Sequence, residues 1–360
     1  MGRELYPSIE AMLAPGVFSG LEGRPVKVVA TTPFHSVDSL SGSRFLAVAT
    51  DNGRGHRYIL KRISVAWDWV MRATEDDRCR AVLSWQTGLL DQMPPEIDHQ
   101  VVACARDGDG WAILMRDAGE GMIPPGDDPI SVEDNRRFLD SMAALNAAFW
   151  ERPERADPRA GFCSLRQRYI ALTPATGRRE SGGPDPIPPL IVEGWELFPS
   201  LVAPDVARVI GALLEDPWPL CEALARYPQT VIHGDWKLGN LGIQRGPQPR
   251  VVLLDWGQVG AAPPAVELAW YLAVNSARLP VSKDEAIACY RDSLQRRLGL
   301  RFDEGWWRPQ LELSLLGGCL QLGSRKALGV ARSESEQVRA RERAELEWWS
   351  AQVRAGARWL

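Results

Sequence analysis

The chain has 360 residues, of which 45% are hydrophobic, and its formal net charge is −4. This length and apolar content are enough to fill the cores of two domains or lobes. A nucleic-acid or anionic-membrane partner would call for an overall basic charge, so we expect no nucleic acid and no membrane as partner.

Cysteine and histidine usage argues against a disulfide framework or a zinc site. The six cysteines form no C-x-x-C pair, and no two of the four histidines stand at ligand spacing. Such isolated cysteines are typical of reduced thiols in the cytosol. The N-terminus carries charge at once and lacks the apolar stretch of a signal peptide. No apolar run approaches the roughly 18–20 residues that span a bilayer. These features predict a soluble cytoplasmic protein.

The first 117 residues are predicted to form a lead-in and a small mixed lobe. Residues 1–25, rich in Pro and Gly, are the expected lead-in, and residues 26–117 the N-lobe. Five short runs of β-branched or alternating apolar residues predict strands: VKVVATTPF, SRFLAVAT, RYILKRI, QVVACA and WAILMRD. DNGRGH supplies a hairpin turn between the second and third runs. The stretch AWDWVMRATEDDRCRAVLSWQTGLL predicts one helix before the fourth run.

Beyond this lobe the pattern becomes mainly helical. A Pro/Gly-rich stretch at residues 118–130 is the expected inter-lobe linker, and residues 131–360 the helical C-lobe. Ser131, with Asp134 three residues later, predicts the N-cap of an amphipathic helix. A second Pro/Gly-rich stretch, residues 173–189, predicts an exposed loop. We therefore expect an α+β, two-lobed architecture with a small β-rich N-lobe and a larger, mainly helical C-lobe.

Two motifs place acidic and amide side chains directly after short apolar runs. In VIHGDWKLGN, Asp235 and Asn240 follow an apolar pair, and in VVLLDWG, Asp255 ends an apolar run fifteen residues after Asn240. A converging carboxylate and amide carbonyl are hard oxygen ligands, which suit Mg²⁺ bound with nucleotide phosphates. Asp235 is then spaced to accept the proton of a substrate hydroxyl. The set indicates phosphoryl transfer.

Phosphoryl transfer also needs a cation on the nucleotide phosphates, and Lys61 supplies one. It lies in YILKRI, on a predicted strand of the small lobe that a helix follows. In the protein-kinase arrangement, a strand lysine holds the α- and β-phosphates and pairs with a helix glutamate. A lysine on a strand could simply extend its ammonium into solvent. The position of Lys61 before the Asp235 and Asp255 motifs is what favours phosphate binding.

The order of these motifs resembles a known enzyme group. HGDWKLGN, LLDWG, YILK and PPAVELAWYL, spread over residues 26–275, are similar to the motifs of aminoglycoside phosphotransferases and choline kinases. These small-molecule kinases share the protein-kinase-like fold. The resemblance implies that Asp235 is the catalytic base, that Asn240 and Asp255 bind Mg²⁺, and that Lys61 anchors the nucleotide phosphates.

The small lobe departs from the protein-kinase pattern at two places. It has no G-x-G-x-x-G, and the turn SLSGSRF, with Ser41 and Gly42, is the expected cover for the phosphates. The acidic helix partner of Lys61 is not evident. Glu75 is the best acidic candidate, although Gln86 stands nearer the usual spacing, and Glu75 could equally be a solvated helix charge.

The resemblance implies further roles around the nucleotide and the catalytic segment. Three residues before the Pro/Gly linker are expected to present the hinge backbone to a purine: Leu114, Met115 and Arg116. His233 is implied to brace the catalytic segment, and Glu267 to brace the start of the next helix. Asn146 occupies a position at which many relatives have His, and no physical reason for it follows from the sequence.

The acceptor is expected to be a small molecule. Only eleven residues separate Asp255 from Glu267, which leaves no room for the activation segment with which protein kinases dock peptides. In this fold the C-terminal helices build the acceptor side. Residues 281–360 contain fourteen Lys or Arg against eleven Asp or Glu. This balance favours a neutral or anionic acceptor over a polycationic one.

These arguments leave more than one function open. One is an antibiotic-modifying resistance kinase that acts on a nucleoside or sugar antibiotic. Another is a metabolic kinase for a sugar, choline or homoserine-like substrate, and a third is a catalytically silent nucleotide-binding relative. In either kinase, ATP or GTP is the expected phosphoryl donor, Mg²⁺ the cofactor and a small-molecule hydroxyl the acceptor. The chain is expected to be a monomer or a homodimer.

Overall fold

The computed structural model describes residues 3–36, 41–152 and 161–360, which form two compact units. The first unit contains residues 3–36, 41–126, Gly161 and Leu238–Gly257. The second contains residues 127–152, Phe162–Lys237 and Gln258–Leu360. Residues 238–257, which the sequence placed in the helical C-lobe, therefore fold with the N-terminal unit.

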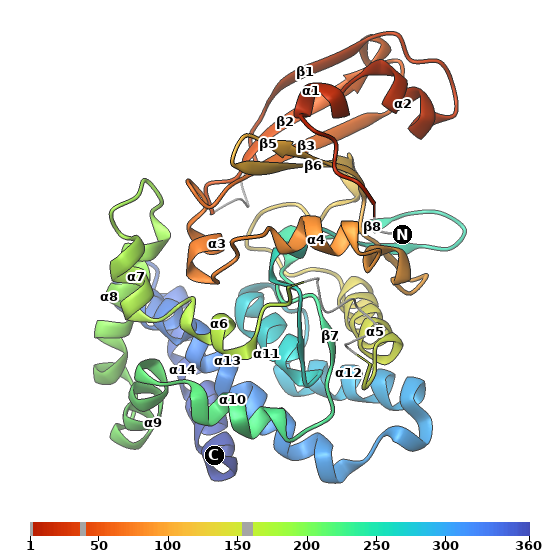
Figure 1. Ribbon diagram of the computed structural model, residues 1–360. Coiled ribbons are helices and arrows are strands. Elements are labelled where there is room, and N and C mark those ends of the chain that lie inside the picture. Colours follow the sequence, from red (N-terminus) through yellow and green to blue (C-terminus); the bar gives the residue numbers. More distant parts are fainter. Residues whose placement is uncertain (1–2, 37–40, 153–160) are drawn as a thin grey trace. The chain divides into compact units, whose positions relative to one another are not determined.

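A five-stranded antiparallel sheet forms the centre of the first unit, in the order β1-β2-β3-β6-β5 (Figure 1). Its strands are β1 (Val29–Phe34), β2 (Arg44–Thr50), β3 (Arg57–Ile63), β5 (Val101–Asp107) and β6 (Gly110–Arg116). The turn between β2 and β3 has positive φ at Asp51, Asn52 and Gly53, the residue types that tolerate it best. The five predicted strands and the α+β class are confirmed.

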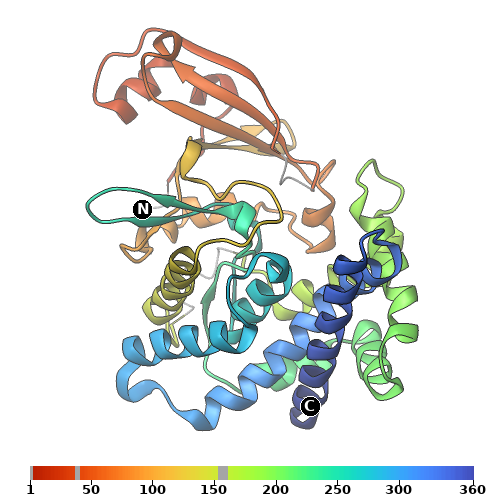
Figure 2. The same cartoon turned by 180° about the vertical axis from the view of Figure 1, so that it is seen from behind.

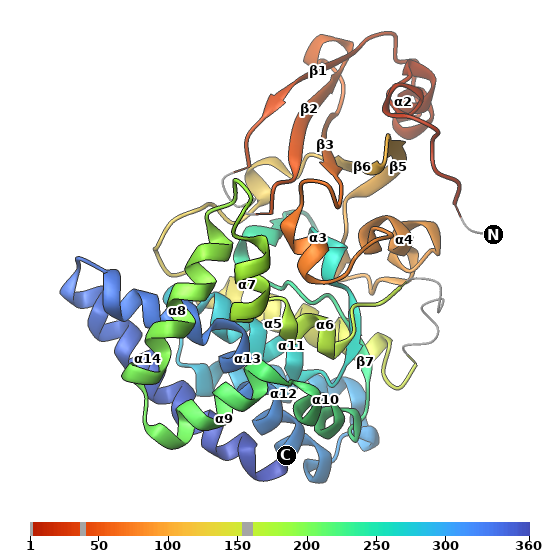
Figure 3. The same ribbon diagram turned by 60° about the vertical axis from the view of Figure 1, so that its left-hand side comes forward.

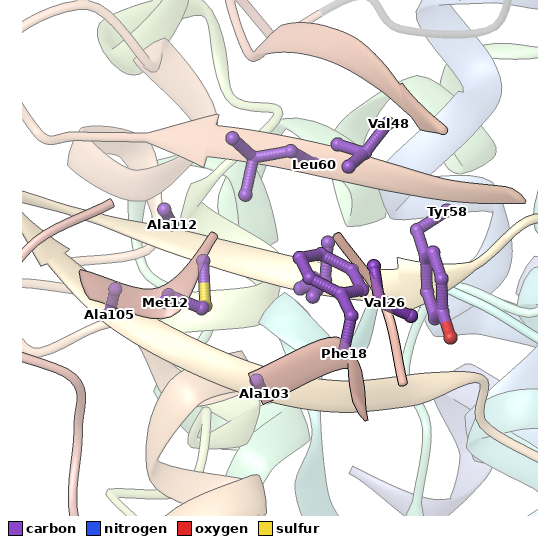
Figure 4. Packing of buried hydrophobic residues seen from close by; sticks show 10 residues of the cluster. Met12, Phe18, Val26, Val48, Tyr58, Leu60, Ala103, Ala105 and Ala112 are labelled. Carbon is purple, nitrogen blue, oxygen red and sulfur yellow. The ribbon is translucent and has the colours of Figure 1, made fainter. Parts of the chain in front are cut away.

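The N-terminal segment packs on this sheet. Residues 1–25 were expected to be a lead-in, but they contain α1 (Ile9–Met12) and α2 (Pro15–Glu22). Met12 and Phe18 are fully buried in a cluster with sheet residues, and the Phe18 ring meets that of Tyr58 edge-on at 5.1 Å (Figure 4). Proline at the first position of α2 and Gly23 in the left-handed region after it start and end a helix. In residues 1–25, proline and glycine therefore mark the ends of a helix, and the lead-in predicted from them is wrong.

Two short helices replace the single helix predicted between β3 and β5. They are α3 (Trp69–Ala73) and α4 (Arg80–Gln86). Between them Glu75 and Cys79 have positive φ, and the Asp76 carboxylate accepts the backbone N–H of Arg80 at 3.0 Å. Aspartate competes in this way with intrahelical hydrogen bonds, so the acidic cluster EDD interrupts the helical pattern.

A second, three-stranded sheet explains why residues 238–257 join the first unit. Its order is β4-β9-β8, with β4 (Ile97–Asp98) parallel to β9 (Arg250–Leu253) and β8 (Leu241–Gln244) antiparallel to it. Leu241 pairs with Leu253, and the Leu254 N–H donates to the Asn240 carbonyl at 2.9 Å. The hairpin thereby holds Asn240 and Asp255 at the same end of β8 and β9.

The second unit is mainly helical (Figures 2 and 3). Its α-helices are α5 (Val132–Ala148), α6 (Leu165–Ile170), α7 (Pro174–Glu180), α8 (Ile187–Leu201), α9 (Pro204–Glu215), α10 (Trp218–Ala225), α11 (Ala265–Val274), α12 (Lys283–Leu298), α13 (Glu304–Arg332) and α14 (Glu336–Gly356). The long helix α13 packs against α8, α11 and α14, and α12 packs against α5. Two short strands, β7 (Thr230–Ile232) and β10 (Gly260–Ala262), pair antiparallel.

The predicted N-cap at Ser131 and the predicted loop at 173–189 have different outcomes in this unit. Ser131 caps α5 as predicted, since its hydroxyl accepts the N–H of Asp134 at 3.0 Å. The exposed loop predicted at 173–189 is wrong, because this segment contains α7 and the first residues of α8. Thr173 caps α7, with proline next at the first helical position.

In the described residues, no helix has an apolar stretch long enough to cross a bilayer.

Candidate active site

The HGDWKLGN segment, residues 233–240, crosses the boundary between the two units. Asp235 belongs to the second unit, whereas Lys61, Asn240 and Asp255 belong to the first. The predicted site residues therefore form two groups, each positioned by its own unit.

In the second unit, a buried glutamate holds the start of this segment. The Glu267 carboxylate, in the first turn of α11, accepts the backbone N–H groups of His233 at 2.8 Å and Gly234 at 2.6 Å. Burial raises the pKa of Glu267 to about 7, although these two N–H groups and the Arg168 guanidinium favour its charged form. The resemblance implied that Glu267 braces the start of its own helix, and its hydrogen bonds instead hold the backbone of the catalytic segment.

Arg168 holds the same turn by donating hydrogen bonds to backbone carbonyls, whereas Glu267 accepts them from backbone N–H groups. Its guanidinium, on α6, donates to the carbonyl of Gly234 at 2.7 Å and to that of Gln258 at 3.1 Å. The arginine is buried, and Gly234 has a φ of 87°. Sequence reasoning missed Arg168, because one arginine on a short helix carries no signal of what it will contact.

The Asp235 carboxylate is almost fully buried and both of its oxygens have a cationic or N–H neighbour. Oδ1 accepts the indole N–H of Trp270 at 3.1 Å, and the Lys237 ammonium lies 3.3 Å from Oδ2. The Asp235 N–H donates to Nδ1 of His233 at 3.2 Å. His233 thus contacts the segment that it was expected to brace. Trp270 and Lys237 were not singled out from the sequence.

Asn146 has a structural reason that the sequence did not reveal. Its side-chain amide donates to the carbonyl of Val231 at 3.1 Å and accepts the Tyr290 hydroxyl at 2.5 Å. Its own carbonyl accepts the Thr230 hydroxyl at 2.6 Å. A neutral side chain that both donates and accepts therefore ties α5 and α12 to the strand that precedes the catalytic segment.

In the first unit, Lys61 and Asp255 form an ion pair. The Lys61 ammonium, on β3, lies 2.8 Å from Oδ1 of Asp255, which follows β9 and has a φ of 65°. Burial opposes the charge on Lys61, but the carboxylates of Asp255 and Asp68 outweigh it, so the pKa of Lys61 is raised. The phosphate anchor and the metal ligand predicted from the sequence are brought together.

Asp68 is an acidic neighbour of Lys61 that the sequence did not single out, and the pairing of Lys61 with Glu75 stays a prediction. Asp68 is the N-cap of α3, accepting the N–H of Met71 at 3.0 Å, and it also accepts the Ser43 hydroxyl at 3.0 Å. Its charge acts on Lys61, whereas Glu75 lies in the break after α3. Burial raises the pKa of Asp68 despite the nearby ammonium. An aspartate only seven residues after the lysine falls outside the spacing that the kinase pattern suggests.

The predicted phosphate-covering turn is anchored at the same helix start. The Ser41 carbonyl accepts the N–H of Trp69 at 3.2 Å, and Gly42 has a φ of 88°. Ser39 and Leu40 of this turn lie outside the described residues. Asp68 and Trp69 therefore connect the Ser41–Ser43 turn to the helix beside Lys61.

The three residues expected at the hinge lie within β6, between β3 and β5. Leu114 is paired on both sides, with Leu60 and Ala103, and so is Met115. The Arg116 N–H donates to the Gln100 carbonyl at 2.9 Å. These residues therefore belong to the strand ladder, and their role beside a purine stays a prediction.

Comparison with known proteins assigns the chain to a family. The model of the phosphotransferase enzyme family matches residues 37–309, which include the motifs YILK, HGDWKLGN, LLDWG and PPAVELAWYL. This chain belongs to the phosphotransferase enzyme family. It is a small-molecule phosphotransferase that uses an alcohol group as acceptor. A search of curated protein sequences gave no match.

Solved structures support the fold of this phosphotransferase. A microcompartment-associated aminopropanol kinase has a TM-score of 0.51 and 13% identity, covering 92% of this chain and 95% of its own. A putative aminoglycoside phosphotransferase from Ralstonia eutropha has a TM-score of 0.51 and 12% identity, covering 94% and 96%. A Plasmodium vivax ethanolamine kinase has a TM-score of 0.50 and 10% identity, covering 89% and 82%. Identities this low show a shared fold and leave the substrate undetermined.

The donor groups at the end of the β8–β9 hairpin fit a magnesium ion. Asp255 offers a carboxylate and Asn240 an amide carbonyl, and Mg²⁺ is commonly bound by one or two carboxylates together with substrate phosphates. Among the residues that the structure describes, no three His, Cys, Asp or Glu side chains gather to hold a metal by themselves. The oxygen-only donor set also disfavours a soft transition metal.

Proposed function

We propose that this phosphotransferase moves the γ-phosphoryl group of ATP or GTP to a small-molecule hydroxyl, with Asp235 as general base. The acceptor oxygen forms a bond to the γ-phosphorus while its proton passes to Asp235. The bond from the γ-phosphorus to the bridging oxygen breaks, and the nucleoside diphosphate leaves. Lys61 holds the nucleotide phosphates, and Asn240 and Asp255 hold Mg²⁺, which neutralises phosphate charge when bound.

The observation that carries this proposal is the Lys61–Asp255 contact. The structure joins the lysine of a predicted strand with the carboxylate that follows VVLL, at 2.8 Å. A cation next to a metal-binding carboxylate is the pairing that a nucleotide phosphate site needs. The segment after Asp255 also supports a small-molecule acceptor, because it forms β10, which pairs with β7 before α11 begins.

The C-terminal helices favour an acceptor with little positive charge. Glu342 of α14 is buried and Glu345 is partly buried, and the Lys326 ammonium lies 3.4 Å from each. Glu345 also pairs with Lys283 of α12. Because lysines already neutralise these acids, the acids would not serve a polycationic acceptor. A nucleoside or sugar antibiotic fits this arrangement, and a sugar, choline or homoserine-like metabolite is the second candidate.

The test is nucleoside-diphosphate release by the purified protein with Mg²⁺ and ATP or GTP. The acceptor panel would contain aminoglycosides, nucleoside and peptide antibiotics, simple sugars, choline and homoserine, with Asp235→Asn as control. Stimulation by one acceptor, lost in the variant, would support the proposal and identify the substrate class. Failure of the protein to bind Mg²⁺–nucleotide would contradict it and favour a catalytically silent relative.

A further inference from the structure

We infer that Trp270 is a positioning residue for the Asp235 carboxylate: its indole N–H holds Oδ1 so that Oδ2 meets the acceptor hydroxyl. This inference rests on the proposed role of Asp235 as base. Its basis is the 3.1 Å hydrogen bond from Nε1 of Trp270 to Oδ1 of Asp235. Both residues are buried: Trp270 is 7% exposed and Asp235 is 6% exposed.

Helix α11 contacts the catalytic segment at two successive points. Glu267 accepts the backbone N–H groups of His233 and Gly234, and Trp270, three residues later on the same face, reaches the side chain of Asp235. The helix and β7 lie close together in two views (Figures 1 and 3). One rigid element therefore fixes both the backbone of the segment and its carboxylate.

A carboxylate in this position needs such a partner. The terminal torsion of aspartate has a broad preference, so rotation would exchange or misdirect the two oxygens. A buried carboxylate must also receive hydrogen bonds, and the indole N–H can only donate. The hydrogen bond from Trp270 satisfies Oδ1 of Asp235, and Oδ2 then points away from the indole.

Trp270 is better suited to this task than Lys237, which lies beside Oδ2. The Lys237 side chain is 27% exposed and has several rotatable bonds, so an incoming acceptor can displace its ammonium. Trp270 is a buried residue of α11, a helix in which every residue from Ala265 to Ala273 is buried. Its orientation is therefore set by packing.

The first test compares Trp270→Phe with a matched variant, Trp195→Phe. Trp195 is also buried in the second unit and also uses its indole N–H, which donates to the Leu172 carbonyl at 2.7 Å. Nucleoside-diphosphate release is measured with Mg²⁺–ATP or Mg²⁺–GTP and the acceptor of the panel that stimulates it most. Trp270→Phe should lower kcat about tenfold and leave the nucleotide KM within about twofold, because one hydrogen bond to a charged group is lost. Trp195→Phe should keep the wild-type kcat.

A double-mutant cycle separates positioning from general loss of structure. In an Asp235→Ala background, Trp270→Phe should cause no further loss of kcat, because the carboxylate that it positions is gone. An equal loss in both backgrounds, or a Trp270→Phe kcat equal to that of Trp195→Phe, would overturn the inference. Failure of the wild-type protein to bind Mg²⁺–nucleotide would instead reject the proposed function, and the inference with it.

A spectroscopic measurement tests the contact without catalysis. In ¹⁵N-tryptophan-labelled protein, the Trp270 indole resonance is identified by its loss in Trp270→Phe. Asp235→Ala should move this resonance, whereas Asp205→Ala, at a surface pair with Arg354, should not. A Trp270 resonance that stays in place in Asp235→Ala would show that the hydrogen bond does not form, even if the Phe variant is too unstable for kinetics.

Discussion

The Lys61 ammonium lies 2.8 Å from Oδ1 of Asp255, a residue 194 positions further along the chain. Lys61 lies on β3 of the five-stranded sheet. Asp255 follows β9 in the β8–β9 hairpin, which belongs to the same unit although it comes much later in the sequence. The ammonium has three N–H donors and the carboxylate has a second oxygen, so each group can also contact the Mg²⁺–nucleotide while this pair is in place.

Asp255→Ala should reduce nucleotide affinity at least tenfold in the presence of Mg²⁺ and much less in its absence, because the metal ligand is removed. Calorimetric titration with and without the metal measures the difference. Asp107→Ala is the matched control, since Asp107 pairs with Arg62 at 2.7 Å in the same unit. Equal affinity loss with and without Mg²⁺ would contradict a metal-binding role for Asp255.

Asp235→Asn should keep the fold and the nucleotide affinity while kcat falls about 10²- to 10⁴-fold, the usual contribution of a general base. The amide remains close in shape and can still accept the Trp270 hydrogen bond. Rates of nucleoside-diphosphate release and a nucleotide titration distinguish the two effects. Turnover equal to that of the wild type would remove Asp235 from its proposed role.

Asp68→Asn should raise the nucleotide KM several-fold without uncapping α3. Asparagine caps helices about as well as aspartate, so this change removes the charge near Lys61 and keeps the hydrogen bond to Met71. Asp68→Ala removes both and should also lower the melting temperature. If the Asn variant has the wild-type KM, Asp68 serves only as a cap.

Glu267→Gln should alter how stability depends on pH. The pKa of Glu267 rises from 4.5 to about 7 on burial. Between these values the carboxyl is ionised in the unfolded chain and protonated in the folded one, so rising pH favours unfolding. The wild type should lose about 3 kcal/mol relative to the Gln variant across this window. Denaturant unfolding at several pH values measures it, and parallel curves for the two proteins would refute the shift.

Gly234→Ala should destabilise the protein by about 2 kcal/mol or more and abolish activity. At a φ of 87°, a Cβ would overlap the Arg168 guanidinium and the Gln258 carbonyl oxygen. Gly211→Ala, in α9, has open space around its Cβ and should be neutral or stabilising by about 0.5–1 kcal/mol. Thermal unfolding of both variants gives the comparison, and equal melting temperatures would contradict the crowding at Gly234.

Local patterns predicted the strands of the first unit and the Ser131 cap because hydrophobic alternation and capping depend on neighbouring residues. They failed where the same residue types have two uses. Pro15 and Gly23 suggested a lead-in but start and end α2, and Thr173 and Pro174 suggested a loop but begin α7. Asp76 interrupts a helix whose apolar periodicity otherwise continues.

The sequence by itself determined the order of the chemical groups: a strand lysine, then Asp235, Asn240 and Asp255 at the spacing of a phosphotransferase, and hence the family. Only the tertiary structure decided which side chains support them. Asp68 acts on Lys61, Arg168 and Glu267 hold the turn at Gly234, and Trp270 reaches Asp235. Spacing along the chain indicates which chemical groups lie near one another when they belong to the same loop. Contacts between residues of different helices depend on how those helices pack, which no local pattern records.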